Sequence, residues 1–217
     1  MKRGKIAVLG SAERTAELMR RALPEGWEWL SFEVPEALEA EALLHADGVF
    51  SLQKAMTKAL PAELLESEVP VFIDAVCETT AALPKHDCIV RVNGWPGFLN
   101  RPLLELAAPE ERRPRAERIL GELGWAFRWV ADDPGMVTAR VLAMIVNEAC
   151  LAVREGVSVP DEVDTAMRLG AAYPSGPFEW ASHIGPERIV NLLSILAETD
   201  PLYTPCPDML GILSSKP

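Results

Sequence analysis

The sequence predicts an α/β domain with a mostly parallel sheet, followed by an all-α domain. Three observations support this prediction. Up to about residue 130, short apolar runs alternate with segments of helical periodicity, which is typical of βαβ units. Beyond Asp133-Pro134-Gly135 only the helical periodicity continues. Because a Pro-Gly pair is typical of a hinge, we expect one domain at 1–133 and the other at 134–217.

Six strands are predicted in the first domain, each from a run of apolar residues that includes β-branched or aromatic side chains. The runs are KIAVLG (5–10), EWLSFEV (28–34), DGVFSL (47–52), VPVFIDA (69–75), CIVRVN (88–93) and AFRWVA (126–131). The intervening segments SAERTAELMRRAL, EALEAEALL and PEERRPRAERILGEL place Leu, Met or Ile at helical spacing with charged residues opposite. They are the predicted helices of the βαβ units.

The second domain is predicted to consist of helices joined by fixed corners. Residues 136–155 present an apolar face wider than one packing neighbour requires, so we expect this helix to be buried on several sides. Asn147 and Glu148 interrupt it and are expected to be hydrogen-bonded. The next helix is expected to close at a left-handed Gly170, after which YPSGP restarts the chain. Gly185-Pro186 repeats this device before ERIVNLLSIL.

Composition and charge exclude several classes of function. The 217 residues carry a formal charge of −11 and a pI near 4.8, so the chain repels phosphate backbones and no nucleic-acid partner is expected. No apolar run approaches the roughly 20 residues that span a bilayer, so no membrane partner is expected. The four cysteines form no CxxC pair, which predicts no metal site and no disulfide framework. We expect a cytoplasmic protein.

The helical part contains a series of spaced motifs: a D-x-PG start, the NEA of the long helix, EGV, DTAMRLG, YPSGP and DPLYTPCPDML, in order over about 80 residues. In this pattern it resembles the C-terminal domain of the 3-hydroxyacyl-CoA dehydrogenases. It is most similar to the extra C-terminal module of long bacterial enzymes, some of which serve aromatic acid catabolism. The resemblance implies a reduced Rossmann-like first domain and a helical bundle that supports dimerisation and one wall of an acyl-CoA cleft.

The resemblance also implies an NAD loop, which this sequence keeps only in part. In VLGSAERT, Gly10 stands at the first glycine of the family's GxGxxG motif, whereas Ala12 and Thr15 replace the second and third. Side chains there are expected to crowd the pyrophosphate. Glu33 stands where a ribose-binding carboxylate is expected. Gly10 is thus the candidate cofactor-binding residue, with NAD as the cofactor if the chain is an enzyme.

Catalytic residues transfer from the family to this sequence incompletely. The family's serine aligns with an alanine of Thr79-Thr80-Ala81-Ala82-Leu83, and its histidine base aligns with Asn93, whose amide does not titrate near neutral pH. Ala139 replaces a further asparagine. Glu105 matches the glutamate that orients the base and is the candidate catalytic residue, although a paired or solvated carboxylate is the alternative role. The loop NGWPGF is expected either to hold Trp95 and Phe98 near a cleft or to be packed.

Two hypotheses of function follow from these residues. In the first, the chain is a non-catalytic member of the family that dimerises and binds an acyl-CoA type ligand or supports a full-length dehydrogenase. In the second, it is an active NAD-dependent 3-hydroxyacyl-CoA dehydrogenase of acyl-CoA catabolism. A homodimer is expected in either case, with helices near 136–155 and 187–198 at the contact, because the long helix has more apolar surface than its short neighbours cover.

Overall fold

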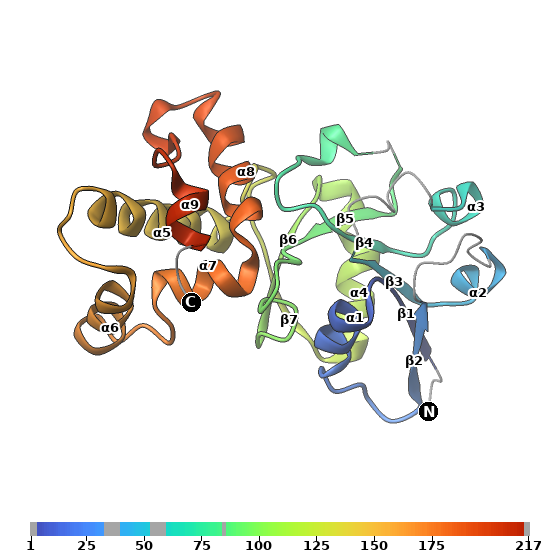
Figure 1. Cartoon of the computed structure of the whole chain (residues 1–217). Coiled ribbons are helices and arrows are strands. Elements are labelled where there is room, and N and C mark those ends of the chain that lie inside the picture. The colour runs from blue at the N-terminus through green and yellow to red at the C-terminus, as the bar shows by residue number, and fades with distance from the viewer. Residues whose placement is uncertain (1–3, 33–39, 53–59, 84–85, 215–217) are drawn as a thin grey trace. The chain divides into compact units, whose positions relative to one another are not determined.

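The computed structural model describes residues 4–32, 40–52, 60–83 and 86–214 (Figure 1). Within this part the chain forms two compact units, 1–136 and 137–217. The first unit carries a seven-stranded sheet and the second is helical. The predicted class, an α/β domain followed by an all-α domain, is therefore confirmed. The division between the units follows Met136, three residues after the predicted boundary.

The sheet of the first unit has the order β2-β1-β3-β4-β5-β6-β7. The first five strands are parallel to one another, β6 is antiparallel to β5, and β7 is parallel to β6. Its strands are β1 (Gly4–Leu9), β2 (Trp27–Phe32), β3 (Gly48–Ser51), β4 (Val71–Asp74), β5 (Ile89–Val92), β6 (Leu103–Ala107) and β7 (Ala126–Trp129). Only β2 lies on the outer side of β1, as expected of a reduced Rossmann-like sheet.

Helices cover both faces of this sheet because its strands alternate two sets of apolar side chains. Ile6 and Val8 of β1 belong to a core that includes residues of α1 and α4, whereas Ala7 and Leu9 belong to a second core with residues of α2 and α3. These helices are α1 (Ala12–Met19), α2 (Ala40–Leu44), α3 (Ala62–Leu65) and α4 (Arg113–Leu123). The unit therefore has three layers, with α1 and α4 on one face and α2 and α3 on the other (Figure 1).

The second unit is built around α5 (Thr138–Arg154), which contacts the helices that follow it. Its buried side chains include Leu142, Val146 and Cys150. The remaining helices are α6 (Pro160–Gly170), α7 (Pro177–Ile184), α8 (Pro186–Ala197) and α9 (Met209–Ser214). The long predicted helix at 136–155 thus begins two residues later and ends one residue earlier than expected.

The end of α6 differs from the prediction at Gly170. This glycine is the last residue of the helix and is not in the left-handed region; Ala172 has a φ of 55° instead. The left-handed residue therefore lies two positions later than the sequence indicates, and the carbonyl of Met167 accepts hydrogen bonds from the N–H groups of Ala171 and Tyr173. The corner at YPSGP nevertheless follows at once.

Candidate functional site

Gly10 follows β1 at the point where the strand order of the sheet reverses. β1 pairs with β2 on one side and with β3 on the other, so the connections that leave β1 and β3 run in opposite directions. Open α/β sheets bind their ligands beside such a reversal, at the carboxyl ends of the strands. A Cβ on Gly10 would lie 3.2 Å from the Cβ of Leu52, so this turn is closely packed. The carboxyl edge of the sheet is the candidate site. Glu33 lies outside the described residues.

Arg14 and Thr15 occupy the first turn of α1 with buried side chains. The Thr15 hydroxyl donates to the carbonyl of Ala12 at 3.0 Å. The Arg14 guanidinium forms an ion pair with Glu17 and donates to the carbonyl of Gly94. The first turn of α1 is therefore filled by its own side chains, and one of them reaches a loop 80 residues further along the chain.

Glu17 also binds this loop, which joins β5 to β6, through hydrogen bonds. One oxygen of its carboxylate accepts hydrogen bonds from the N–H groups of Gly97 and Leu99, at 2.9 and 3.0 Å. Gly97 has a φ of 87°, a conformation that favours glycine. Together, Arg14 and Glu17 hold the β5–β6 loop against α1.

Asn93 and Glu105 meet at the base of this loop. The Asn93 side-chain nitrogen donates to Glu105 Oε2 at 3.0 Å, and the Asn93 backbone N–H donates to the Glu105 carbonyl at 3.0 Å. The Asn93 side-chain oxygen accepts from the N–H of Trp95 at 3.3 Å. Asn93 is only 3% exposed. The structure thus brings together two residues that the family pattern pairs, and the Glu105 carboxylate has an amide as its partner.

Gly94 and Trp95 are buried, so this part of the loop does not line an open cleft. A Cβ on Gly94 would lie 2.4 Å from the Cγ of Asp74 at the end of β4, which leaves room for glycine alone. Trp95 is 1% exposed and belongs to the core. Phe98 is half-buried beneath the Arg101 guanidinium. Of the two roles expected for NGWPGF, the structure favours packing for Trp95.

Arg91 lies near the carboxyl edge of the sheet, and it was not identified from the sequence as a candidate residue. It lies on β5 with a fully buried side chain. Its guanidinium donates to Asp132 Oδ1 at 2.5 Å and to the carbonyls of Ala75 and Val76 at 2.9 and 3.2 Å. A charged residue inside the apolar run CIVRVN was the signal that could have found it, because a buried charge requires partners.

Thr80 completes this cluster. Its backbone N–H donates to both Asp132 oxygens at 3.1 and 3.0 Å, and its hydroxyl donates to Oδ2 of the same carboxylate. Burial alone raises the pKa of Asp132, but hydrogen bonds from the Thr80 hydroxyl and from Arg91 outweigh it, so the pKa is lowered from its ordinary value of 3.8. The short 3-10 helix Thr80–Ala82 is therefore fixed to the segment that ends the first unit.

Of the three histidines, His45 and His86 belong to the first unit, and neither lies at the carboxyl edge of the sheet. His86 precedes β5, so it lies at the opposite end of that strand from Asn93. His45 follows α2, with Nδ1 2.7 Å from the carbonyl of Glu41. His183 is an exposed residue of α7 in the other unit. Asn93 can hold a polar group by hydrogen bonds, but its amide takes no proton near neutral pH.

In the helical unit, spaced motifs are joined by buried hydrogen bonds. Asn147 of α5 donates to the carbonyl of Thr204 at 3.0 Å and accepts from the N–H of Cys206 at 2.7 Å, whereas Glu148 is exposed. Asp164 of α6 is 1% exposed and accepts from the N–H groups of Phe178 and Glu179 at the start of α7. Asp164 therefore supplies acceptors to the free N–H groups at this helix end.

The cysteines and the possible metal ligands do not form a reactive site among the described residues. All four cysteines are free thiols, and Cys88, Cys150 and Cys206 are buried. Burial raises the pKa of Cys88 to about 11 and that of Cys150 to about 12. Such thiols are poor nucleophiles at neutral pH. Among the described residues, no three His, Cys, Asp or Glu side chains are grouped so as to hold a metal ion.

Comparison with known proteins identifies the helical unit. Residues 135–213 match the family described as 3-hydroxyacyl-CoA dehydrogenase, C-terminal domain. The helical unit therefore carries the C-terminal domain of the 3-hydroxyacyl-CoA dehydrogenase family. The 3-hydroxyadipyl-CoA dehydrogenase of Escherichia coli K12 is 40% identical over 100 residues, which cover 45% of the chain and 21% of that enzyme. A probable 3-hydroxybutyryl-CoA dehydrogenase of Bacillus subtilis is 36% identical over 104 residues, 47% of the chain and 36% of that protein.

The family fold extends over the whole chain. The structure of (S)-3-hydroxybutyryl-CoA dehydrogenase from Ralstonia eutropha superposes with a TM-score of 0.75 and covers 99% of the chain and 94% of that enzyme. At 18% identity this likeness concerns the fold alone. The chain spans only about a fifth to a third of the length of the two family members it matches in sequence, the E. coli and B. subtilis proteins. The resemblance to the 3-hydroxyacyl-CoA dehydrogenases is confirmed, whereas the activity of this member is a separate question.

Proposed function

We propose that this chain is a non-catalytic member of the 3-hydroxyacyl-CoA dehydrogenase family. In this proposal it forms a homodimer through its helical unit and either binds an acyl-CoA type ligand or supports a full-length dehydrogenase. One observation carries the proposal: the Glu105 carboxylate, which matches the family's orienting glutamate, is hydrogen-bonded to the amide of Asn93. An amide in place of an imidazole removes the general base, whose contribution is typically 10²–10⁴-fold in rate.

The turn after β1 supports the same proposal, because its residues do not fit a dinucleotide. A pyrophosphate requires close approach to backbone N–H groups at a helix start. Here Arg14 and Thr15 are buried in that turn, and the Arg14 guanidinium is already paired with Glu17. Glu13 adds a negative charge to the first turn, where it disfavours a second anion. We therefore propose no redox step for this chain.

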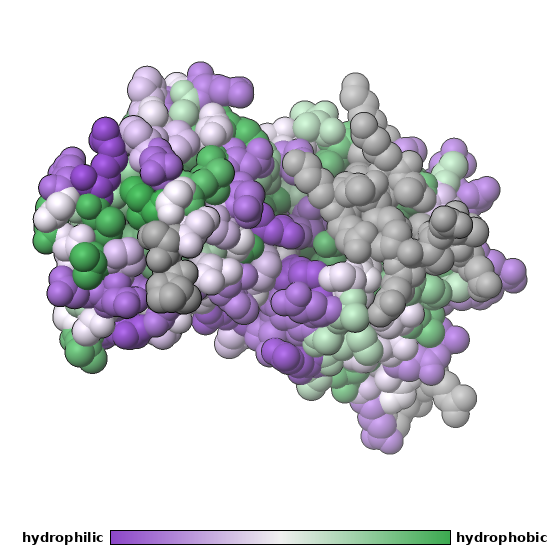
Figure 2. All heavy atoms as spheres, viewed as in Figure 1, coloured by the Kyte–Doolittle hydropathy of each residue, from purple (hydrophilic) through white to green (hydrophobic). Residues whose placement is uncertain are grey.

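Exposed apolar side chains support the homodimer. Val137 and Val141 lie one helical turn apart and are 53% and 54% exposed. Apolar residues also appear among polar ones on the visible surface of the helical unit (Figure 2). Among the described residues, no helix is long and apolar enough to cross a membrane. Unpaired, buried cysteines support a reducing compartment, and we propose the cytoplasm.

The fold and family membership favour the second candidate, an active NAD-dependent 3-hydroxyacyl-CoA dehydrogenase. Calorimetric titration with NADH and with acetoacetyl-CoA separates the two candidates. We expect no NADH binding. Binding of acetoacetyl-CoA alone would assign a ligand-binding role, and binding of neither ligand would assign a role with a partner enzyme. NADH binding at micromolar concentration, with oxidation of NADH on adding acetoacetyl-CoA, would establish the active enzyme and overturn our proposal.

Replacement of Asn93 tests whether restoring a base is enough to restore activity. We expect Asn93→His to pair with Glu105 yet to give no turnover, because the β1–α1 turn still excludes the nucleotide. Asn93→Gln is the matched control, since it keeps an amide and introduces no base. Turnover of acetoacetyl-CoA by the natural chain at a rate equal to that of Asn93→His would show that Asn93 does not occupy the place of the base.

A further inference from the structure

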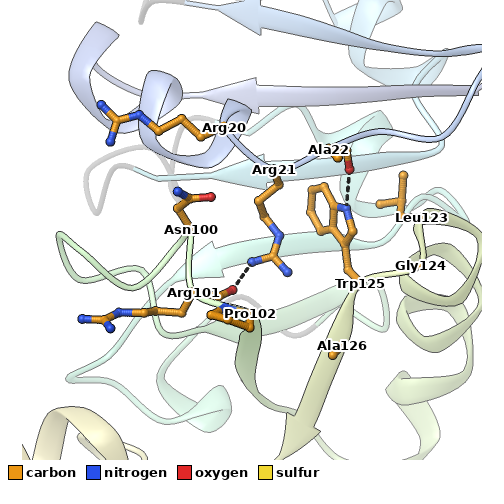
Figure 3. A pocket seen from close by; sticks show the side chains of 10 residues that line it. All are labelled: Arg20, Arg21, Ala22, Asn100, Arg101, Pro102, Leu123, Gly124, Trp125 and Ala126. Carbon is orange, nitrogen blue, oxygen red and sulfur yellow. Dashed lines mark hydrogen bonds between the residues drawn. The ribbon is translucent and has the colours of Figure 1, made fainter.

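A surface pocket of about 410 Å³ lies in the first unit, away from the carboxyl edge at Gly10 (Figure 3). Three segments line it: the end of α1, the chain before β6 and the turn between α4 and β7. Three of its ten lining residues are arginines, Arg20, Arg21 and Arg101, and none of the ten is acidic. In a chain with a net charge of −11, such a concentration of positive charge is unexpected.

Arg21 is positioned by neutral groups. Its Nη1 donates to the carbonyls of Leu99 and Arg101 at 3.1 and 2.5 Å, and its guanidinium lies 4.6 Å from the centre of the Trp125 ring. No carboxylate in the described part of the chain forms an ion pair with it. Burial lowers the pKa of Arg21, which is the expected effect of desolvating a cation. The charge of Arg21 is thus held in place and is not neutralised by an acidic partner.

The other polar groups of the pocket are oriented toward one side. In Figure 3, Arg20 and Arg101 extend in the same direction with Asn100 between them, and Arg21 lies between Asn100 and Trp125. Arg101 is anchored at its Nε, which donates to the carbonyl of Gly97 at 3.0 Å. Planar guanidinium groups match the oxygens of a phosphate and bind it through paired hydrogen bonds. The polar side of the pocket is therefore suited to a phosphoryl group.

The opposite side of the pocket is apolar. Leu123 and Ala126 line it beside Trp125, whose indole N–H donates to the carbonyl of Ala22 at 2.9 Å, whereas Pro102 lies next to Arg101 (Figure 3). The volume exceeds what a free phosphate ion requires and lies in the range of small-molecule sites, roughly 300–1,000 Å³. The chemistry of the two sides together matches a molecule with a charged end and an apolar end.

We infer that this pocket is a binding site for a small organic phosphate, with the phosphoryl group on the polar side that Arg20, Arg21 and Arg101 line and the apolar part against the Trp125 side. The inference goes beyond the proposed function, because it depends neither on NAD nor on the Asn93–Glu105 pair. Asn100 supplies an additional donor to the phosphoryl oxygens.

Phenyl phosphate is a suitable probe, because it carries a phosphoryl group and an apolar ring but neither an adenine nor a thioester, and the variants below assign its binding to this pocket. We expect calorimetry at low ionic strength to give a dissociation constant below about 1 mM, with inorganic phosphate and phenol each at least about tenfold weaker. The Trp125 indole N–H resonance, assigned with Trp125→Phe, is expected to shift during the titration.

Arg20→Gln and Arg101→Gln are expected to weaken phenyl phosphate binding at least about fivefold each. Arg20 is exposed, so its replacement leaves the fold intact. Arg118→Gln is the matched control, since it removes an exposed arginine of α4 that does not line the pocket. The inference would be overturned if Arg118→Gln weakened binding as much as the pocket variants, or if neither pocket variant changed the affinity. It would also be overturned if inorganic phosphate bound as tightly as phenyl phosphate. Titration of Arg20→Gln with acetoacetyl-CoA is expected to match the natural chain, which separates this site from the proposed function.

Discussion

Asn93 determines what the carboxyl edge of the sheet can do to a bound molecule. Both ends of its amide are engaged, one with Glu105 and one with the N–H of Trp95. A buried amide held in this way is preorganised for hydrogen bonding and does not change charge near neutral pH. Position 93 therefore offers no group that exchanges a proton near neutral pH.

Arg91, whose side chain is fully buried, forms an ion pair with Asp132, and this pair predicts a dependence of stability on pH. The pKa of Asp132 is lowered in the folded state, so its carboxylate stabilises the fold above the ordinary value of 3.8. This stabilisation is lost as the pH falls from that value through the lower folded-state pKa. Removing the negative charge also leaves the Arg91 cation buried without its partner.

We expect Asp132→Asn to reduce the free energy of unfolding by about 2 kcal/mol at pH 7 and to have progressively less effect below pH 4. Urea denaturation at several pH values measures both quantities. Asp133→Asn, which changes the exposed neighbouring carboxylate, is the control and should alter stability by less than about 0.5 kcal/mol. An effect of Asp132→Asn that stays constant down to pH 2 would contradict the assignment.

β6 is the element that assembles the candidate site. Its antiparallel pairing with β5 sets Arg91 opposite Ala107 and Val92 opposite Leu106, which brings Glu105 beside Asn93. The run LLELA did not stand out as a strand, because its five residues carry neither β-branched nor aromatic side chains. Pairing with a neighbour, more than local preference, therefore makes this segment a strand. Its register then decides which residues meet.

The corner between α6 and α7 is set by one buried carboxylate. Asp164 accepts hydrogen bonds from Phe178 and Glu179, while the Glu179 carboxylate accepts from the Gly176 N–H and pairs with Arg168. The two helices therefore share their polar groups at this point. The rigid YPSGP sequence places the start of α7 over Asp164.

Two glycines near this corner give a matched pair of substitutions. A Cβ on Gly176 would lie 2.1 Å from Oδ1 of Asp164, whereas a Cβ on Gly170 would meet nothing within 4 Å. We expect Gly176→Ala to destabilise the fold by about 1–3 kcal/mol and Gly170→Ala to stabilise it by up to about 1 kcal/mol. Thermal denaturation of both variants measures the difference. Equal melting temperatures for the two would show that the corner does not require the close approach.

At the scale of the molecule, the two units carry different features. The first carries the sheet edge at Asn93 and the arginine pocket, and the second carries the 3-hydroxyacyl-CoA dehydrogenase C-terminal domain. The exposed Val137 precedes α5, the exposed Val141 lies in its first turn, and both are within the predicted contact region at 136–155. Large exposed apolar side chains at neighbouring positions usually mark an interface.

We expect the natural chain to sediment at micromolar concentration with twice its mass of 23.8 kDa. Val141→Glu is expected to raise the dimer dissociation constant at least about tenfold, because it places a charge in the predicted contact. Val157→Glu is the control, since Val157 is 73% exposed but lies outside both predicted contact helices. Sedimentation of the natural chain as a 23.8 kDa species alone would exclude the dimer.

The sequence by itself determined the two fold classes, six of the seven strands and the family of the helical part. Those features depend on periodicity and on motifs whose members lie within a few helical turns of one another, such as DTAMRLG and YPSGP. Only the tertiary structure decided that Arg91 pairs with Asp132, 41 residues away, and that Arg14 reaches Gly94, 80 residues away. Local preferences act over a few residues, whereas these contacts exist only once strand register has brought distant segments together.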